Sequence, residues 1–139
     1  MDHIAVLKKG WLEKILLGEK TIESRWYKNN KTPYKRITCG DIIYFKETGK
    51  PITVKAITKK ALFFDKLDRD KTKKIIKKYG KDICISQSFS REVLGKRYCT
   101  LIFLENVQPI DQPFKINKKG YGLMSSWISV DNIDKIRLY

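Results

Sequence analysis

A short stretch of the chain carries three charged side chains that can recognise a polar ligand together: Lys20, Glu23 and Arg25. Side chains alternate along an extended strand, so Glu23 and Arg25 share one face. A carboxylate held between two cations stays ionised and can orient a donor such as an exocyclic amine, while Lys or Arg binds phosphate. The spacing indicates a reader of anions or base edges. A surface cluster of salt bridges on an exposed strand has the same spacing and is the alternative.

Aromatic side chains accompany this charged stretch. Trp26 follows it directly, and Tyr121 and Trp127 come later in the chain. A base stacked on such a ring contributes about 1 to 3 kcal/mol to binding. Core packing is the alternative for each of the three rings.

Basic side chains gather in two further segments, one directly after the charged stretch and one in a later charged run. Either cluster can follow a phosphate backbone, and either can be a solvated face of the fold. The first cluster consists of Lys28, Lys31, Lys35 and Arg36, and the second of Lys71, Lys73, Lys74, Lys77 and Lys78.

The overall charge favours a polyanionic partner. The chain has 30 basic and 15 acidic residues, a formal net charge of +15. Such an imbalance is typical of nucleic-acid-binding proteins. We therefore expect RNA or another nucleic acid as the partner. A basic helix with bulky apolar residues on its other face is not evident, which disfavours a membrane surface, and a chain with no specific partner is the remaining alternative.

Several classes of chemistry are disfavoured by what the sequence does not contain. His3 is the only histidine and stands near the N-terminus, so we expect no Ser/His/Asp arrangement and no histidine base. Phosphate-binding and dinucleotide-binding glycine motifs are absent. Cys39, Cys84 and Cys99 lack the spacing of a zinc site or a disulfide framework, and each is expected to be a small buried residue. We expect no metal and no cofactor.

Hydrophobic spacing predicts the elements that position these side chains. Residues 8–17 have the spacing of an amphipathic helix that ends at Gly18, and residues 21–26 alternate as a strand. Residues 27–38 have the composition of a loop. Further strands are expected at 42–45, 52–64, 98–107 and 127–130, with a closing segment at 136–139 and a second helix from Asp68 to Tyr79 that stops at Gly80. Pro109 and Pro113 are expected to interrupt the chain after the strand at 98–107, and residues 81–97 are left partly unassigned.

These elements predict one domain over residues 1–139 of the α+β class. Five to six short strands with local antiparallel pairing, together with two to three helices, favour a small mixed β-barrel over alternating βαβ units. An apolar fraction of 42% is that of an ordered globular chain. The N-terminal apolar run has four residues, far too few for a signal segment, so we expect a soluble and cytoplasmic protein. We also expect a monomer.

The motif Gly18-x-Lys20-x-x-Glu23-x-Arg25, placed after an amphipathic helix, resembles the signature of ASCH domains. The resemblance extends to Gly40-Asp41 before a hydrophobic strand and to Ser126-Trp127-Ile128 near the C-terminus. It implies a PUA-like β-barrel that associates with RNA, with the motif lining a cleft. Related PUA-like domains read modified bases in aromatic cages, a role that the resemblance extends to Trp26 or Trp127.

An enzyme is the alternative that the same resemblance implies. Some ASCH proteins resemble amidohydrolases that act on N4-acylated cytidine through a Lys, a Thr nucleophile and a carboxylate. Lys20 matches that lysine, whereas Glu23 stands where those proteins have threonine. Other relatives are associated with ribonuclease activity, for which Lys20 and Glu23 would be the acid and base pair.

Overall fold

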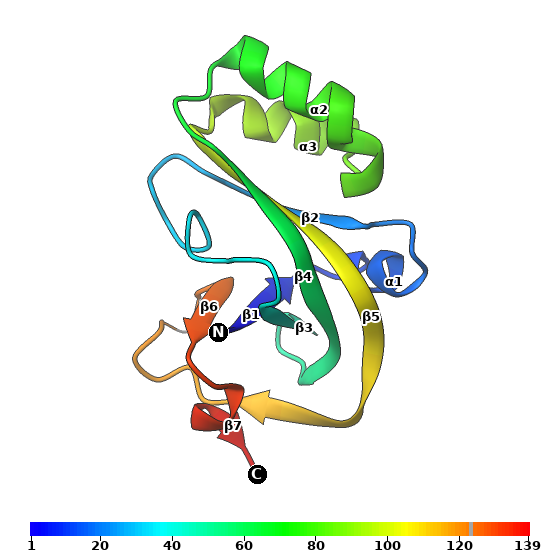
Figure 1. The fold of residues 1–139 in the computed structure, drawn as a ribbon, viewed down its shortest axis with the longest axis vertical. Coiled ribbons are helices and arrows are strands. Elements are labelled where there is room, and N and C mark those ends of the chain that lie inside the picture. The colour runs from blue at the N-terminus through cyan, green and yellow to red at the C-terminus, as the bar shows by residue number, and fades with distance from the viewer. Residues whose placement is uncertain (123) are drawn as a thin grey trace.

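The computed structural model describes residues 1–122 and 124–139, which form one curled mixed sheet with two of the three helices at one end and the first helix beside the sheet (Figure 1). The strands are β1 (Asp2–Leu7), β2 (Ile22–Tyr27), β3 (Ile42–Glu47), β4 (Ile52–Phe64), β5 (Tyr98–Ile116), β6 (Trp127–Val130) and β7 (Arg137–Leu138). The helices are α1 (Trp11–Leu16), α2 (Arg69–Ile83) and α3 (Gln87–Glu92), with short 3-10 turns η1 (Val93–Gly95) and η2 (Ile133–Lys135). The α+β class and the barrel-like sheet are confirmed.

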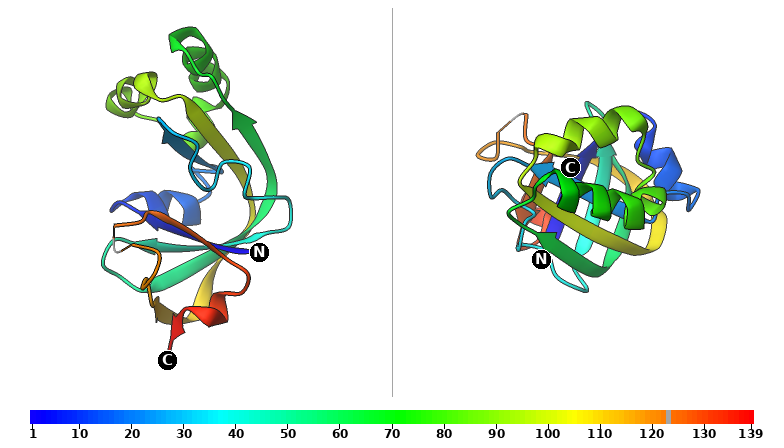
Figure 2. Two further views of the ribbon diagram at one scale, coloured as in Figure 1. Left: turned by 90° about the vertical axis from the view of Figure 1, so that its left-hand side faces the viewer. Right: turned by 90° about the horizontal axis from the view of Figure 1, so that it is seen from above.

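The sheet has the strand order β2-β5-β4-β3-β1-β6, and β7 pairs with the far end of β5. Only β1 and β3 run parallel among the pairs formed by the described residues. The β4 and β5 strands are long, and their pairing shifts register at three places. Such bulges bend and twist a strand pair. The sheet consequently curls from the helices at one end to β7 at the other (Figure 2).

Three apolar clusters hold the curled sheet together. The first lies inside the curl and includes Phe45 and Ile102 with Ile15 of α1, and the second fills the end near β7. The third lies under α2 and α3, where Ile22 and Trp26 of β2 pack with Ile75 of α2. One face of β2 therefore packs in this third cluster. The other face and the outer edge of β2 remain available to form a ligand-binding site.

The helices differ from the sequence-based expectation at their ends. The first helix begins at Trp11 and not at residue 8, because Gly10 has a left-handed φ of 98°. The second continues through Gly80 to Ile83 and ends at Cys84, whose φ is 62°. A Cβ on Gly80 would lie 2.9 Å from Cγ2 of Ile85, so this glycine accommodates close packing and does not stop the helix. The expectation that α2 ends at Tyr79 was wrong for that reason.

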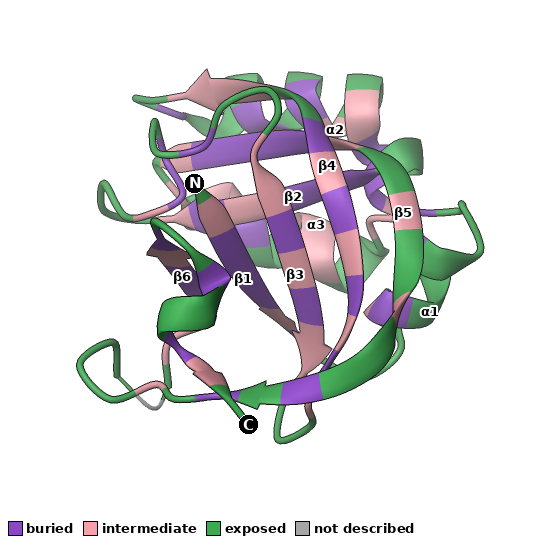
Figure 3. Cartoon of the chain, turned by 60° about the horizontal axis from the view of Figure 1, so that its bottom comes forward, coloured by how far each residue is buried: buried purple, intermediate pink, exposed green. Residues whose placement is uncertain are grey.

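Two strand predictions also need correction. The chain continues as β5 through Pro109 and Pro113 to Ile116, although both prolines were expected to interrupt it. Beyond Phe103, β2 no longer pairs with β5, and β7 pairs with it only from Lys115 on. Between these points one side of β5 has no partner strand, and proline, which lacks an N–H, is tolerated at such edges. Figure 3 shows this part of β5 largely exposed. The N-terminal strand β1 was not predicted at all.

The cysteines are all free, but only one is as buried as expected. Cys99 is buried, Cys84 is half-buried and Cys39 is exposed. No helix of the described residues is long and apolar enough to cross a membrane.

Candidate functional site

The edge strand β2 places the charged motif beside a cavity. After α1, Gly18 takes a left-handed φ of 77°, and the chain returns to Thr21, whose N–H donates to Asp82 O at 3.0 Å. Strand β2 then pairs with β5 on one side and is the last strand of the sheet on the other. Its outer edge is therefore available to form one wall of a site.

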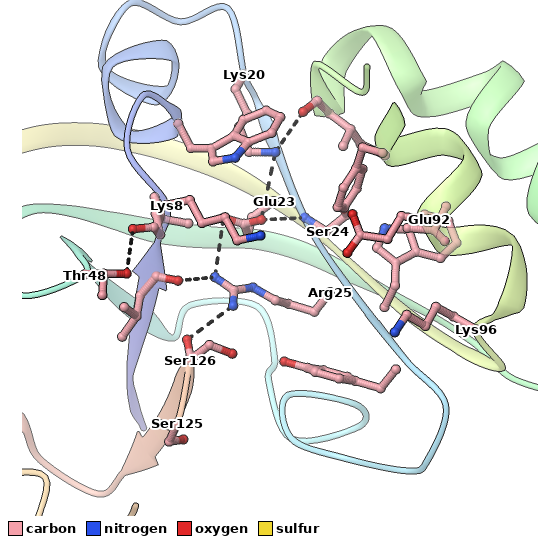
Figure 4. A pocket seen from close by; sticks show the side chains of 18 of the residues that line it. Lys8, Lys20, Glu23, Ser24, Arg25, Thr48, Glu92, Lys96, Ser125 and Ser126 are labelled. Carbon is pink, nitrogen blue, oxygen red and sulfur yellow. Dashed lines mark hydrogen bonds and ion pairs between the residues drawn. The ribbon is translucent and has the colours of Figure 1, made fainter. Parts of the chain in front are cut away.

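The cavity has a volume of ≈ 390 Å³ and is built from segments far apart in the sequence. Ligand pockets of small molecules start at about 300 Å³, so this one is large enough for a nucleoside-sized group. Its walls come from β1, β2, α1, the end of α2, α3 and the segment before β6 (Figure 4). The side chains used below are Lys8, Trp11, Lys20, Glu23, Arg25, Trp26, Tyr27, Phe89, Glu92, Lys96, Lys118, Ser125 and Ser126.

Lys20 lines the cavity and is 3% exposed. Its ammonium donates to the carbonyls of Ile22 at 2.9 Å and Ile83 at 2.8 Å, which ties the end of α2 to β2. The Nζ atom also lies 3.9 Å from Oε1 of Glu23 and 5.0 Å from the centre of the Trp11 ring. Burial lowers the pKa of Lys20, and the attraction of Glu23 opposes that shift.

Glu23 lies between the two cations of the motif (Figure 4). It is 4% exposed, with Oε1 facing Lys20 and Oε2 at 3.8 Å from Nη2 of Arg25. Oε1 also accepts a hydrogen bond from the backbone N–H of Ser24 at 2.9 Å. The carboxylate thus binds a backbone amide of its own strand. Two cations and an amide donor therefore surround the carboxylate.

Arg25 is held in place by backbone carbonyls and by an aromatic ring. Its two terminal nitrogens donate to Ser126 O at 3.2 Å and Val6 O at 3.3 Å, and its guanidinium carbon lies 5.1 Å from the centre of the Trp127 ring. Arginine stacks well on aromatic faces because its charge is delocalised and weakly hydrated. The guanidinium therefore has a fixed position at the cavity wall.

Three neighbouring side chains of β2 each keep one buried polar atom without a hydrogen-bond partner among the described residues. These atoms are Oε2 of Glu23, Nε of Arg25 and Nε1 of Trp26, and all three side chains line the cavity. Buried polar groups in folded proteins are normally paired. Glu23 and Arg25 share one face of β2, so this face offers one acceptor and one donor, which match a ligand with both, as the edge of a nucleobase has.

The charge of the cavity is basic. Among the described residues that line it, Lys8, Lys96 and Lys118 add to Lys20 and Arg25, against Glu23 and Glu92. Lys8 is exposed and Lys96 is half-buried, whereas Lys118 donates to Ser125 O at 2.8 Å.

The structure brings together only part of the set that the sequence suggested. Lys20, Glu23, Arg25 and Trp26 share the cavity. Trp127 lies beneath Arg25 and is buried, and Tyr121 is 43% exposed and lies outside the cavity lining. The four cations of the first basic cluster are exposed on the loop after β2 and also lie outside the lining: Lys28, Lys31, Lys35 and Arg36. Trp11, Phe89, Lys8 and Lys96 were missed, because only the long-range topology brings them to β2.

The expectation that no Ser/His/Asp arrangement can form was wrong. His3 is completely buried in β1, its Nε2 lies 2.8 Å from Oδ2 of Asp41, and its Nδ1 lies 2.8 Å from Oγ of Ser129. The indole Nε1 of Trp127 donates to the same Nδ1 at 3.3 Å. An indole nitrogen can only donate, so Nδ1 is the acceptor and the proton sits on Nε2. The histidine lies outside the cavity, where it supports the ring on which Arg25 stacks.

A metal centre has no support among the described residues, which contain no group of three or more His, Cys, Asp or Glu side chains placed to hold an ion.

Comparison with known proteins defines the fold but not the activity. No family model and no curated protein matches the chain. The crystal structure of ASCH from Zymomonas mobilis is similar, with a TM-score of 0.72 and 18% identity over 96% of this chain and 90% of that one. A variant of that protein gives the same TM-score and identity, with 93% of its chain covered. A hypothetical protein, PH0355, has a TM-score of 0.51 and 21% identity over 79% of this chain and 100% of its own. The chain therefore shares the fold of ASCH from Zymomonas mobilis.

Proposed function

We propose that the chain is an ASCH-type module that binds single-stranded RNA, with a base in the cavity beside β2 and the backbone held by Lys8 and Lys96 of the cavity lining. The observation that carries the proposal is the pair of unpartnered polar atoms, Oε2 of Glu23 and Nε of Arg25, on side chains that share one face of β2 and line the cavity. A base edge supplies both an amine for the carboxylate and an acceptor for the guanidinium. The free thiols of the three cysteines are typical of a protein of the cytoplasm.

Aromatic walls and basic charge support a nucleotide over a neutral ligand. Trp11, Tyr27 and Phe89 line the same cavity and offer faces for base stacking. Exposed Lys8 and half-buried Lys96 can approach phosphates without loss of an existing ion pair among the described residues. Backbone contacts of this kind position a strand, and contacts with a base edge provide selectivity.

The test is binding of a fluorescent single-stranded RNA dodecamer across a salt series, measured by anisotropy. The double variant Lys8→Gln/Lys96→Gln should reduce the slope of log affinity against log salt by about 1.4, since each phosphate contact contributes about 0.7 for single strands. The matched control is Lys59→Gln/Lys115→Gln, which removes the same charge from exposed positions of β4 and β5 that do not line the cavity. Equal weakening by both variants, or affinity independent of salt, refutes the proposal.

Hydrolysis at Lys20 and Glu23 is the second candidate function. One observation favours it: burial lowers the pKa of Lys20, and a lowered pKa brings an amine closer to general-base chemistry. The two carbonyls that accept from Nζ and the nearby carboxylate favour the protonated amine, which is why binding is our first choice. Incubation with RNA and with N4-acetylcytidine, followed by product analysis, decides the matter: turnover that is lost in Glu23→Gln would establish the enzyme.

A further inference from the structure

A second cavity, the α2/α3 groove, lies between the two helices at the end of the sheet. It has a volume of ≈ 580 Å³. Its cations are Arg69, Lys73 and Lys77 from α2 and Arg91 from α3, and Ile76 and Leu94 form apolar surface between them. Figure 2 shows α2 and α3 side by side when the molecule is seen from above. The groove is thus a recess with basic walls.

The charge of the groove is not compensated within the described part of the chain. Arg69, Lys73 and Lys77 are spaced four residues apart, which places them in one row along α2. No Asp or Glu of the described residues lines the groove, and none of the ion pairs they form includes its four cations. Like charges four residues apart on a helix repel each other. A bound polyanion would relieve that repulsion.

The groove and the cavity beside β2 share a wall. Phe89, Glu92 and Val93 line the cavity, while Ser90, Arg91 and Leu94 from the same short segment line the groove. An α-helix with its side chains is about 10 to 12 Å across, so the two recesses are separated by the thickness of α3. A flexible strand that leaves the cavity reaches the groove within a few nucleotides.

We propose that the α2/α3 groove is a subsite for the phosphodiester backbone of the same RNA strand whose base occupies the cavity. The inference rests on the proposed function and extends it: the footprint covers α3, and the four cations of the groove bind phosphates on its far side. A lipid surface fits less well, because none of the large exposed apolar side chains of the described residues, such as Leu17 or Met124, lines the groove.

The experiment compares a short and a long RNA on matched variants. Lys73→Gln/Lys77→Gln removes two cations of the groove, and Lys74→Gln/Lys81→Gln removes two exposed cations of the same helix that do not line it. Glutamine has nearly the helix propensity of lysine, so both variants keep the helix, which circular dichroism checks. Anisotropy is measured with a labelled RNA dinucleotide and with an unstructured RNA dodecamer.

The groove variant should bind the dinucleotide as the wild type does and the dodecamer more weakly, with a salt slope lower by about 1.4. The ratio of wild-type to variant affinity for the dodecamer should therefore shrink about sevenfold between 50 and 200 mM salt, which is the same difference in slope expressed as a ratio. The control variant should retain most of the wild-type slope.

Other outcomes overturn the inference. Equal slopes for the groove and control variants would refute the subsite while leaving the cavity in place, provided that the dinucleotide still binds. An equal loss of dinucleotide binding would show that these lysines act at the cavity or at a distance. Wild-type protein that binds neither RNA refutes the proposed function as well. Binding to vesicles rich in anionic lipid, lost in the groove variant while RNA binding is unchanged, would assign the groove to a membrane surface.

Discussion

Replacing Glu23 with Gln removes the only negative charge from a buried group of three ionised side chains. In the folded protein the carboxylate lies 3.9 Å from the Lys20 ammonium and 3.8 Å from the Arg25 guanidinium, and it is 4% exposed. The amide of Gln has nearly the same shape, and its oxygen can still accept from the Ser24 N–H. The substitution therefore tests charge with little change in packing.

The expected cost follows from what remains after the change. Removing one partner of a buried ion pair costs about 3 to 5 kcal/mol, because the other charge stays buried without compensation. Two cations are left here, but both keep hydrogen bonds to backbone carbonyls. We therefore expect the lower limit, a loss of about 3 kcal/mol in the free energy of unfolding. For a domain of this size that corresponds to a fall of about 10 °C in Tm.

Urea unfolding followed by circular dichroism, supported by calorimetry, measures this loss. The control is Asp131→Asn, which removes a pair with a shorter N···O distance of 3.1 Å but with side chains 62% and 77% exposed. Exposed pairs are worth at most about 1 kcal/mol. If Glu23→Gln is as stable as the wild type, or if the exposed pair costs as much, then burial does not control the energy of these ion pairs and the reasoning is wrong.

Three further predictions concern other parts of the fold. Burial lowers the pKa of His3, although Asp41 opposes this shift, so the unfolded chain binds a proton at higher pH than the folded chain does. The free energy of unfolding measured in urea should therefore fall as the pH drops below about 6.5, and His3→Gln should flatten that profile. Higher wild-type stability at acid pH would contradict this prediction. Gly80→Ala should lower the Tm despite its better helix propensity, because Cγ2 of Ile85 lies in the way; a higher Tm would contradict this. A thiol reagent should modify exposed Cys39 first and Cys99, whose pKa is raised by burial, only on unfolding; early modification of Cys99 would contradict its burial.

The charged motif could be predicted from sequence because its geometry is local. Alternation over residues 21–26 placed Glu23 and Arg25 on one face and Trp26 on the other, and β2 has this arrangement. The start of α2 was equally readable, since Asp68 caps it by accepting from Lys71 N at 2.8 Å.

The remainder of the site depends on contacts between distant residues. Strand β1 pairs with β3 and β6, and four of its six residues are buried, so its sequence is a continuous apolar run without the alternation of a half-buried strand. With β1 unrecognised, the burial of His3 and the position of Lys8 at the cavity could not be derived. Phe89 lies in a six-residue helix that has no buried residue, which leaves no periodic signal to detect.

The most direct test of the account is to map where RNA contacts the protein. An oligonucleotide containing 4-thiouridine would be cross-linked by light to the wild-type chain, and the modified peptides identified by mass spectrometry. We predict cross-links to the aromatic walls of the cavity, at Trp11, Tyr27 or Phe89. Cross-links confined to the opposite end of the sheet, at Tyr44 or Phe114, or no cross-link under conditions in which the RNA is bound, would contradict the placement of the RNA site at β2.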